Sequence, residues 1–175
     1  MEPLTSFRTI VLTFVLITVL GACSGQAPTQ SIGGGPEPLD NAISEQDIGS
    51  LNPPEDTLEP SPGAASISGL VYSYTVRRVL PKTLLYLTPA LGENDDSMPS
   101  LLIGPVEENG DITSTTDEDG QIYLSHIPPG NYYIILWAPL NWSAVENSPT
   151  EQKPRLIILE AGDRQALGTL FVSWP

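Results

Sequence analysis

The segment Asn131–Ala138 constrains the fold most strongly, because it contains six consecutive apolar and aromatic residues, Tyr132–Trp137. A run of this length, rich in aromatic and β-branched side chains, is typical of a β-strand. Both alternating faces of such a strand are apolar. We therefore expect it to be a central strand whose two faces are both largely covered.

Shorter strand-like runs surround this segment and are separated by residues that favour turns. The expected strands are 66–74, 82–88, 111–116, 121–125, 155–160 and 165–173, with Leu101–Ile103 as a further candidate inside a longer connection, 90–110. We expect 111–116 and 121–125 to pair across a turn, and 141–153 to form a loop. The pattern contains no convincing amphipathic helix. It predicts an all-β fold, a single antiparallel β-sandwich of the seven-strand type over residues 66–175.

The amino-terminal end has the pattern of an export signal. A polar start with one basic residue, Arg8, precedes the apolar run Thr9–Leu20, which is too short to cross a bilayer core of about 30 Å. The next residues complete Leu20-Gly21-Ala22-Cys23, which resembles the lipobox of bacterial lipoproteins: an aliphatic residue, two small residues and a cysteine. The resemblance implies a signal peptide over residues 1–22, cleavage between Ala22 and Cys23, and attachment of diacylglycerol and further acyl chains such as palmitate to Cys23.

Residues 23–65 are predicted to be the lipidated cysteine and a disordered linker. From Ser24 to Ala65 the chain is rich in Gly, Pro, Ser and Gln, and it carries seven acidic residues and no Lys or Arg. Such a segment buries too little apolar surface to offset the entropy lost on ordering. We interpret it as a stalk, with a short partner-binding helix around Asn41–Leu51 as the alternative.

Two motifs within the predicted sandwich resemble a known family. Thr115–Leu124 and Ile127–Ile134 are similar to the central pattern of carboxypeptidase regulatory-like domains, which are transthyretin-like sandwiches also similar to the B-type repeats of bacterial collagen adhesins. Ile67–Val71 matches the first strand of that family, whereas the connection 90–110 departs from a minimal repeat. In that family the module usually accompanies an enzyme or belongs to a surface array.

The turn in the first motif has a structural explanation and a calcium alternative. Asp117 can accept backbone N–H bonds and hold a turn in which Gly120 supplies a positive φ. Alternatively, Asp117 and Asp119 can supply the hard oxygen ligands that Ca²⁺ prefers, although their spacing is not that of an EF-hand. The carboxylates that can join them are Asp95, Asp96, Asp111 and Glu118.

Aromatic residues raise a second binding hypothesis, a platform for a sugar ring formed by Trp137, Trp142, Tyr132 and Tyr133. Trp142, in the expected loop 141–153, is the best exposed candidate for contact with a sugar ring. Tyr132, Tyr133 and Trp137 belong to the central strand, and we expect most of them to be core residues because alternation sends some of them inward.

Charge and composition exclude several classes of function. The formal net charge of −14 opposes binding to nucleic acid and to anionic headgroups through a basic patch. The single histidine, His126, is most simply a turn residue. The sequence holds no nucleophile elbow, phosphate loop or His/Cys metal cluster. We therefore predict no catalytic residues, no enzymatic activity, and no cofactor beyond the lipid on Cys23 and a candidate calcium ion.

These patterns together predict a bacterial lipoprotein of the cell envelope. The lipid would hold it on the outer face of the cytoplasmic membrane or in the outer membrane. Its partners would be that membrane and an envelope protein or glycan, bound by a non-catalytic β-sandwich with an interaction or structural role. A carbohydrate- or calcium-binding surface module is the alternative.

Overall fold

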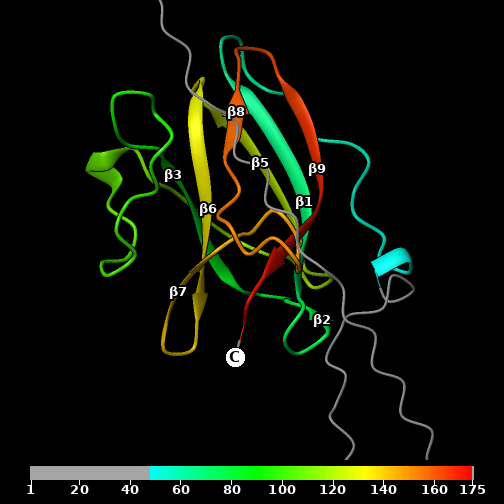
Figure 1. Cartoon of the computed structure of the whole chain (residues 1–175). Helices are drawn as coiled ribbons and strands as arrows, with labels where there is room; N and C mark the ends of the chain where they lie inside the picture. The colour runs from blue at the N-terminus through cyan, green and yellow to red at the C-terminus, as the bar shows by residue number, and fades with distance from the viewer. Residues whose placement is uncertain (1–47, 175) are drawn as a thin grey trace, which may run out of the picture. The chain divides into compact units, whose positions relative to one another are not determined.

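The structure is a computed structural model that describes residues 48–174, and it is built from two β-sheets (Figure 1). The strands of this part of the chain are β1 (Ala65–Ser73), β2 (Arg78–Val79), β3 (Leu84–Pro89), β4 (Ile112–Thr115), β5 (Gln121–Ile127), β6 (Gly130–Ala138), β7 (Asn141–Ala144), β8 (Ile157–Leu159) and β9 (Arg164–Val172), with one short 3₁₀ helix, η1 (Glu107–Asn109). The prediction of an all-β sandwich is confirmed. No helix among the described residues is long and apolar enough to span a membrane.

The first sheet, sheet A, is built around β1. Strand β9 runs parallel to β1 and pairs with it along Ser66–Ser73. The other edge of β1 is shared by two strands, β5 and β2, and both run antiparallel to β1. Strand β5 pairs beside Ala65–Leu70, and β2 pairs beside Tyr72 and Ser73. Every residue of β1 is buried, as expected of a central strand.

The second sheet, sheet B, is built around β6, the central strand that the sequence predicts. Strand β3 pairs with one edge of β6, and β4 pairs with the far edge of β3. The other edge of β6 is shared by β8, beside Gly130–Tyr132, and β7, beside Ile135–Ala138. All these pairs are antiparallel.

The main core lies between the two sheets. Alternate residues of the central strands point into it, including Ile67 and Val71 from β1 and Ile134 and Leu136 from β6, all fully buried. Removing an aliphatic side chain of this size from water stabilises a fold by roughly 1.5–3 kcal/mol.

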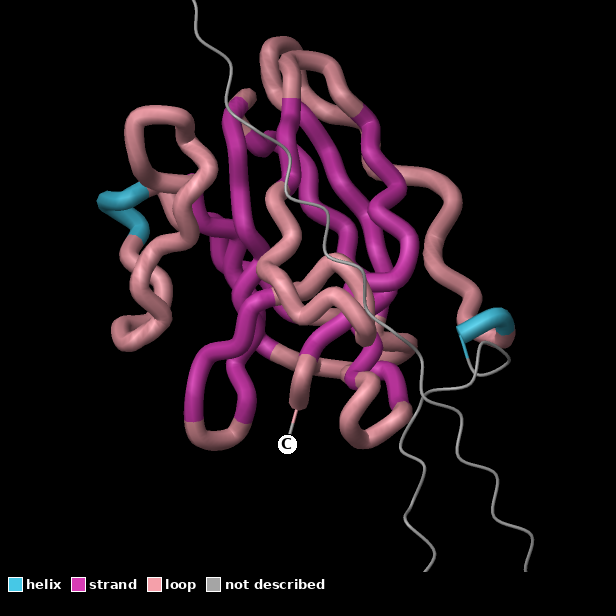
Figure 2. Tube along the Cα trace, in the orientation of Figure 1, coloured by secondary structure: helices cyan, strands magenta, loops and turns pink. Residues whose placement is uncertain are grey.

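Two irregular segments lie on opposite sides of the sandwich (Figure 1). Residues 50–64, which we call the strap, lie against sheet A, where Thr57 accepts a hydrogen bond from Ser66 Oγ at 3.1 Å. Residues 90–111, which we call the excursion, leave β3 and return at β4 over sheet B. Figure 2 shows both as loops flanking the strands; the excursion contains the helical turn η1, and another helical turn, at residues 48–49, precedes the strap. The strap lies within the predicted linker, and the boundary at residue 65 stays a prediction.

The excursion covers half of the outer face of sheet B. Its main-chain oxygens at Asp95 and Asp96 accept hydrogen bonds from the side chains of Asn131 and Tyr133. Beneath it lies a second, smaller apolar core on the outward side of β3 and β6. Its buried members are Tyr86, Ala90, Tyr133 and Ile135.

Several local predictions are wrong. The strands β4 and β5 do not pair with each other, because the turn at 117–120 carries the chain from sheet B to sheet A. Leu101–Ile103 is a turn in the excursion. The predicted loop 141–153 begins with β7, which forms by pairing with β6. The two-residue strand Arg78–Val79 was not predicted, because it is too short to show a pattern.

Candidate ligand-binding surface

The outer face of sheet B carries a row of side chains that the excursion leaves open. Thr115 of β4 lies opposite Leu84 of β3, and Trp137 of β6 lies opposite Trp142 of β7. Leu85 pairs with Leu136, so the preceding residue, Leu84, lies beside Trp137. We call Thr115, Leu84, Trp137 and Trp142 the open row. Leu84 is 38% exposed and Trp137 41% exposed, whereas Trp142 is half-buried.

The two tryptophans of the open row are held by aromatic contacts. The ring centroids of Trp137 and Trp142 lie 4.9 Å apart, and those of Trp142 and Tyr86 lie 5.0 Å apart, both in edge-to-face geometry. A Cβ added at Gly104 would lie 3.0 Å from Trp142 Cζ2, so the excursion packs directly against this ring. Because Trp142 is packed on both sides, it supports Trp137, which presents its surface to solvent.

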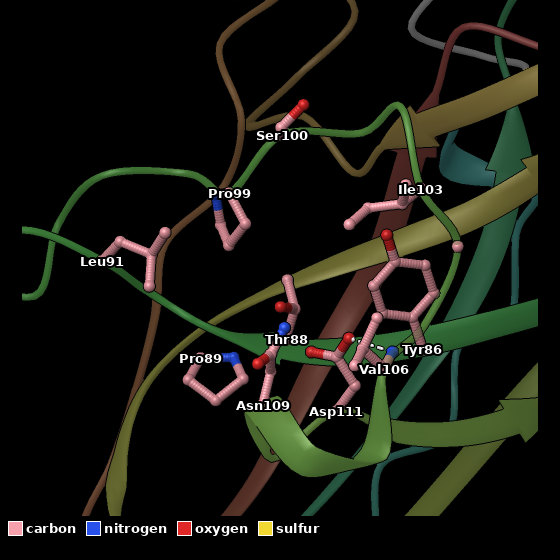
Figure 3. Close-up of a pocket in the computed structure, with 11 residues that line it drawn as sticks. Tyr86, Thr88, Pro89, Leu91, Pro99, Ser100, Ile103, Val106, Asn109 and Asp111 are labelled. Atoms are coloured by element: carbon pink, nitrogen blue, oxygen red, sulfur yellow. Dashed lines mark hydrogen bonds between the residues drawn. The ribbon is translucent and has the colours of Figure 1, made fainter.

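A cavity of about 390 Å³ lies between β3 and the excursion, next to the open row. Its lining includes Tyr86, Thr88, Pro89, Leu91, Ile103 and Asp111 (Figure 3). Tyr86 belongs both to this lining and to the aromatic contact with Trp142. The buried Tyr86 therefore connects the wall of the cavity to the tryptophans of the open row.

The Asp111 carboxylate gives the cavity an unused hydrogen-bond acceptor. Its Oδ2 accepts a hydrogen bond from the Val106 N–H at 2.8 Å (Figure 3). Its Oδ1 is buried and has no hydrogen-bond partner among the described residues. A donor to this oxygen, from water or from a ligand, would remove a cost of about 1–3 kcal/mol.

The electrostatics of the cavity favour a neutral ligand that can donate hydrogen bonds over an anionic ligand. Burial raises the pKa of Tyr86, and the negative charge of Asp111 raises it further, so the phenol stays protonated and can donate a hydrogen bond. The excursion carries six acidic residues and no Lys or Arg. An anionic ligand would be repelled here, whereas a neutral ligand with hydroxyl groups would not.

The predicted calcium residues hold a turn. Asp117 Oδ1 accepts hydrogen bonds from the backbone N–H groups of Asp119 and Gln121 at 2.9 and 2.8 Å, and Gly120 has a φ of 78°. Glu118 pairs instead with Lys82 at 3.1 Å. Within residues 48–174 no group of three or more His, Cys, Asp or Glu side chains is placed to hold a metal ion.

The remaining predicted residues are dispersed. Trp142 lies in a strand instead of a loop, and it joins the aromatic surface described above. His126 lies in strand β5 instead of a turn, where it adopts a positive φ of 64°, and its Nδ1 lies 2.7 Å from Ser125 Oγ. Ala22 and Cys23 lie outside the described residues, so the cleavage and lipidation sites stay predictions.

Sequence reasoning named Trp137 among four candidate aromatic residues and placed Trp142 first, but it did not select Leu84 or the buried Tyr86. Alternation contains part of the signal, because it places Trp137 on the face opposite to Ile134 and Leu136. The excursion determines which part of that face stays open, and its packing position cannot be predicted from a local sequence pattern.

The described part of the chain is thus an all-β sandwich with an aromatic row and a cavity on one outer face. No family model matches the chain, and no curated protein sequence matches it.

Several solved structures align with parts of the chain at low similarity. A "putative carbohydrate binding protein" from Pseudomonas aeruginosa aligns at 17% identity with a TM-score of 0.39, over 74% of this chain and 97% of that chain. The major pilin subunit of Bacillus cereus aligns at 18% identity with a TM-score of 0.38, over 65% of this chain and 31% of the pilin. A 9R-lipoxygenase from Cyanothece aligns at 15% identity with a TM-score of 0.33, over 71% and 19% of the respective chains. At these values the likeness does not identify a ligand or an activity.

Proposed function

We propose that this chain is a lipid-anchored protein of the bacterial cell envelope whose β-sandwich binds an envelope ligand without catalysis. The open row beside the cavity carries this proposal. Contiguous exposed apolar surface is a feature of places where a folded domain contacts another molecule. Here Leu84 and Trp137 are more than a third exposed and adjoin a cavity with an unpaired acceptor, Asp111 Oδ1. Apolar walls with a few fixed polar groups are typical of ligand sites.

The anchor in this proposal is supported by the sequence around Cys23. An aliphatic residue and two small residues precede the only cysteine, directly after a short apolar run. Several acyl chains would hold the protein at a membrane surface, because each methylene group buried in the bilayer contributes about 0.8 kcal/mol to binding. The strongly acidic chain would not reach anionic headgroups by charge alone.

The finer assignment to carboxypeptidase regulatory-like, transthyretin-like domains is also a proposal. It is supported by the two motifs and by the structural roles of Asp117 and Gly120, which hold the turn between β4 and β5. A module of this kind without catalytic groups agrees with a role in binding.

Intact mass spectrometry of the membrane-extracted protein tests the anchor. We expect a mature chain that begins at Cys23 and carries the mass of attached lipid, and we expect Cys23→Ser to lose that mass. An unlipidated wild-type chain would contradict the anchor and leave the binding surface to be judged separately.

Retention of envelope material tests the binding surface. Solubilised envelope polysaccharides and proteins are passed over immobilised full-length protein in three forms: wild type, Trp137→Ala and Tyr123→Ala. Tyr123 is a matched control, because it is an equally exposed aromatic residue, at 40%, on β5 of sheet A. We expect the wild type and Tyr123→Ala to retain a ligand that Trp137→Ala loses. Equal retention by all three would overturn the proposal for this surface.

A further inference from the structure

We infer that the ligand of the open row and the adjoining cavity is a neutral glycan chain, a conclusion that rests on the proposed function and specifies its ligand. A sugar ring would lie against Trp137 and Trp142, and its hydroxyl groups would bond to Asp111 and Tyr86 in the cavity.

The shape of the aromatic surface favours sugar rings. A pyranose has faces of C–H groups and a rim of hydroxyls, so it needs a flat apolar surface with hydrogen-bonding groups at the side. The Trp137 ring is exposed and braced by Trp142, whose ring contacts Tyr86 at the cavity. A braced ring loses little side-chain freedom on binding, which preserves affinity.

The direction of the open row favours a chain over a single sugar. The row crosses β4, β3, β6 and β7, and neighbouring strands lie about 4.8 Å apart, so it extends over roughly 14 Å. A ligand that follows this line is longer than one ring. The large exposed apolar side chains of the row are Leu84 and Trp137, which offer far less than the roughly 800 Å² per side that a stable protein partner needs.

The cavity supplies one acceptor and one donor for hydroxyl groups. Asp111 lines the cavity, and its Oδ1 is buried and unpaired among the described residues, so a glycan hydroxyl would donate to it after a small movement that uncovers this oxygen. The Tyr86 hydroxyl belongs to the same cavity and can donate to a ring or hydroxyl oxygen. A sugar hydroxyl both donates and accepts, so it suits this pair.

The charge of the excursion selects against anionic glycans. The excursion, which forms one side of the cavity, carries six acidic residues and no Lys or Arg. Uronic acids and phosphate- or sulfate-bearing polymers would meet repulsion from this field. Neutral polysaccharides would not.

Affinity electrophoresis of the detergent-extracted full-length protein tests this inference. Native gels contain hydroxyethylcellulose, laminarin or xyloglucan as neutral probes, and carboxymethylcellulose as the anionic counterpart of the first. We expect at least one neutral polysaccharide to retard the wild type and Tyr123→Ala, and carboxymethylcellulose to retard neither. Trp137→Ala should bind at least about tenfold more weakly, the loss expected for a central aromatic contact.

Conservative variants separate the roles of the aromatic and polar groups. Trp137→Tyr keeps an aromatic face and should retain part of the binding. Tyr86→Phe and Asp111→Asn should each weaken binding by roughly three- to tenfold, as the loss of a single hydrogen bond does. Circular dichroism and thermal melting confirm that each variant is folded before its binding is compared.

Three outcomes would overturn the inference. They are no retardation of the folded wild type by any neutral polysaccharide, equal losses in Trp137→Ala and Tyr123→Ala, or stronger retardation by carboxymethylcellulose than by hydroxyethylcellulose. If neutral glycans fail but an envelope protein is retained in a Trp137-dependent way, the inference falls and the proposed function stands. If neither class binds through Trp137, both fall.

Discussion

The outer face of sheet A and the outer face of sheet B are covered to different extents. On sheet A the outward residues of β1 are buried, including Ser66, Leu70 and Tyr72. Strap residues Leu51 and Asn52 line hollows together with Leu70, so the strap lies over this part of the sheet. On sheet B the excursion covers one end, and the open row remains at the other.

The side chains on the two faces match this difference. Beneath the strap, β1 presents small residues such as Ser66 and Ser68, which let an irregular segment lie close to the sheet. Sheet B presents aromatic residues in both its covered and its open part, for example Tyr133 beneath the excursion and Trp137 in the open row. An aromatic face that is only partly covered by its own chain retains apolar surface for a ligand. The proposed binding surface accordingly lies on sheet B.

The largest expected effect distinguishes the covered part of sheet B from its open part. Ile135 is fully buried beneath the excursion, so Ile135→Ala should lower the free energy of unfolding by about 2–5 kcal/mol, as a core cavity does. Leu84→Ala, in the open row, should cost less than about 1 kcal/mol because its side chain is already partly hydrated. Urea denaturation measures both. Equal losses would show that the open row is a structural part of the fold.

The next largest effect concerns the connection between the sheets at the end of β4. Thr116 Oγ1 accepts a hydrogen bond from the Thr83 N–H at 2.8 Å and donates one to the Leu80 carbonyl at 2.6 Å. Thr116→Val preserves the shape but leaves two buried backbone groups unpaired, so we expect a loss of about 1–3 kcal/mol. Thr115→Val, one residue away in the exposed open row, is the control. A neutral Thr116→Val would show that water replaces these bonds.

Much of the sandwich was predictable because the residue pattern of a central strand indicates which of its faces are buried. The apolar run Tyr132–Trp137 indicated a strand covered on both faces, and β6 is the centre of sheet B. The turn at Asp117 and Gly120 was predictable for the same reason, since its geometry depends on residues within the turn.

The errors arose where distant contacts decide the structure. Asn141–Ala144 becomes a strand only because Trp142 pairs with Trp137 across β6. Leu101–Ile103 has a strand-like composition, yet Leu102 is 93% exposed in a turn. The same limitation applies to the site: Trp142 was selected because a loop was expected there, but it is half-buried in β7, and Trp137 is the more exposed of the two.

Alkaline pH should destabilise the fold partly through the covered side of sheet B. Burial raises the pKa of Tyr86, with the charge of Asp111 adding to it. The unfolded chain ionises its tyrosines near pH 10, before the folded chain does, so it releases protons first and stability falls as the pH rises through that value. Stability from this tyrosine is therefore complete below about pH 9. Urea midpoints from pH 8 to 11 should fall less steeply in Tyr86→Phe and in Asp111→Asn. An unchanged slope in both would contradict this assignment.

The smallest expected effect examines how firmly the strap covers sheet A. Arg164 of β9 contacts Glu59 at 2.9 Å, and it donates hydrogen bonds to the carbonyl and hydroxyl oxygens of Thr57 at 3.0 and 3.2 Å. These groups are largely exposed, so Arg164→Ala should lower the unfolding free energy by less than about 1 kcal/mol. Amide hydrogen exchange in the strap should nevertheless accelerate, because its anchors to β9 are lost.

Lys153→Ala provides the control for this last experiment, since it removes an exposed ion pair with Glu151 that does not involve the strap. We expect it to leave exchange in the strap unchanged. If Arg164→Ala instead lowered stability by more than about 2 kcal/mol, the strap would act as an integral part of sheet A, beyond what an exposed ion pair contributes. Faster exchange with little global loss would show that the strap is a separable cover. In that case the strap and the excursion would differ in how much of their sheet they cover. Both segments would still lie outside the main core that stabilises the sandwich.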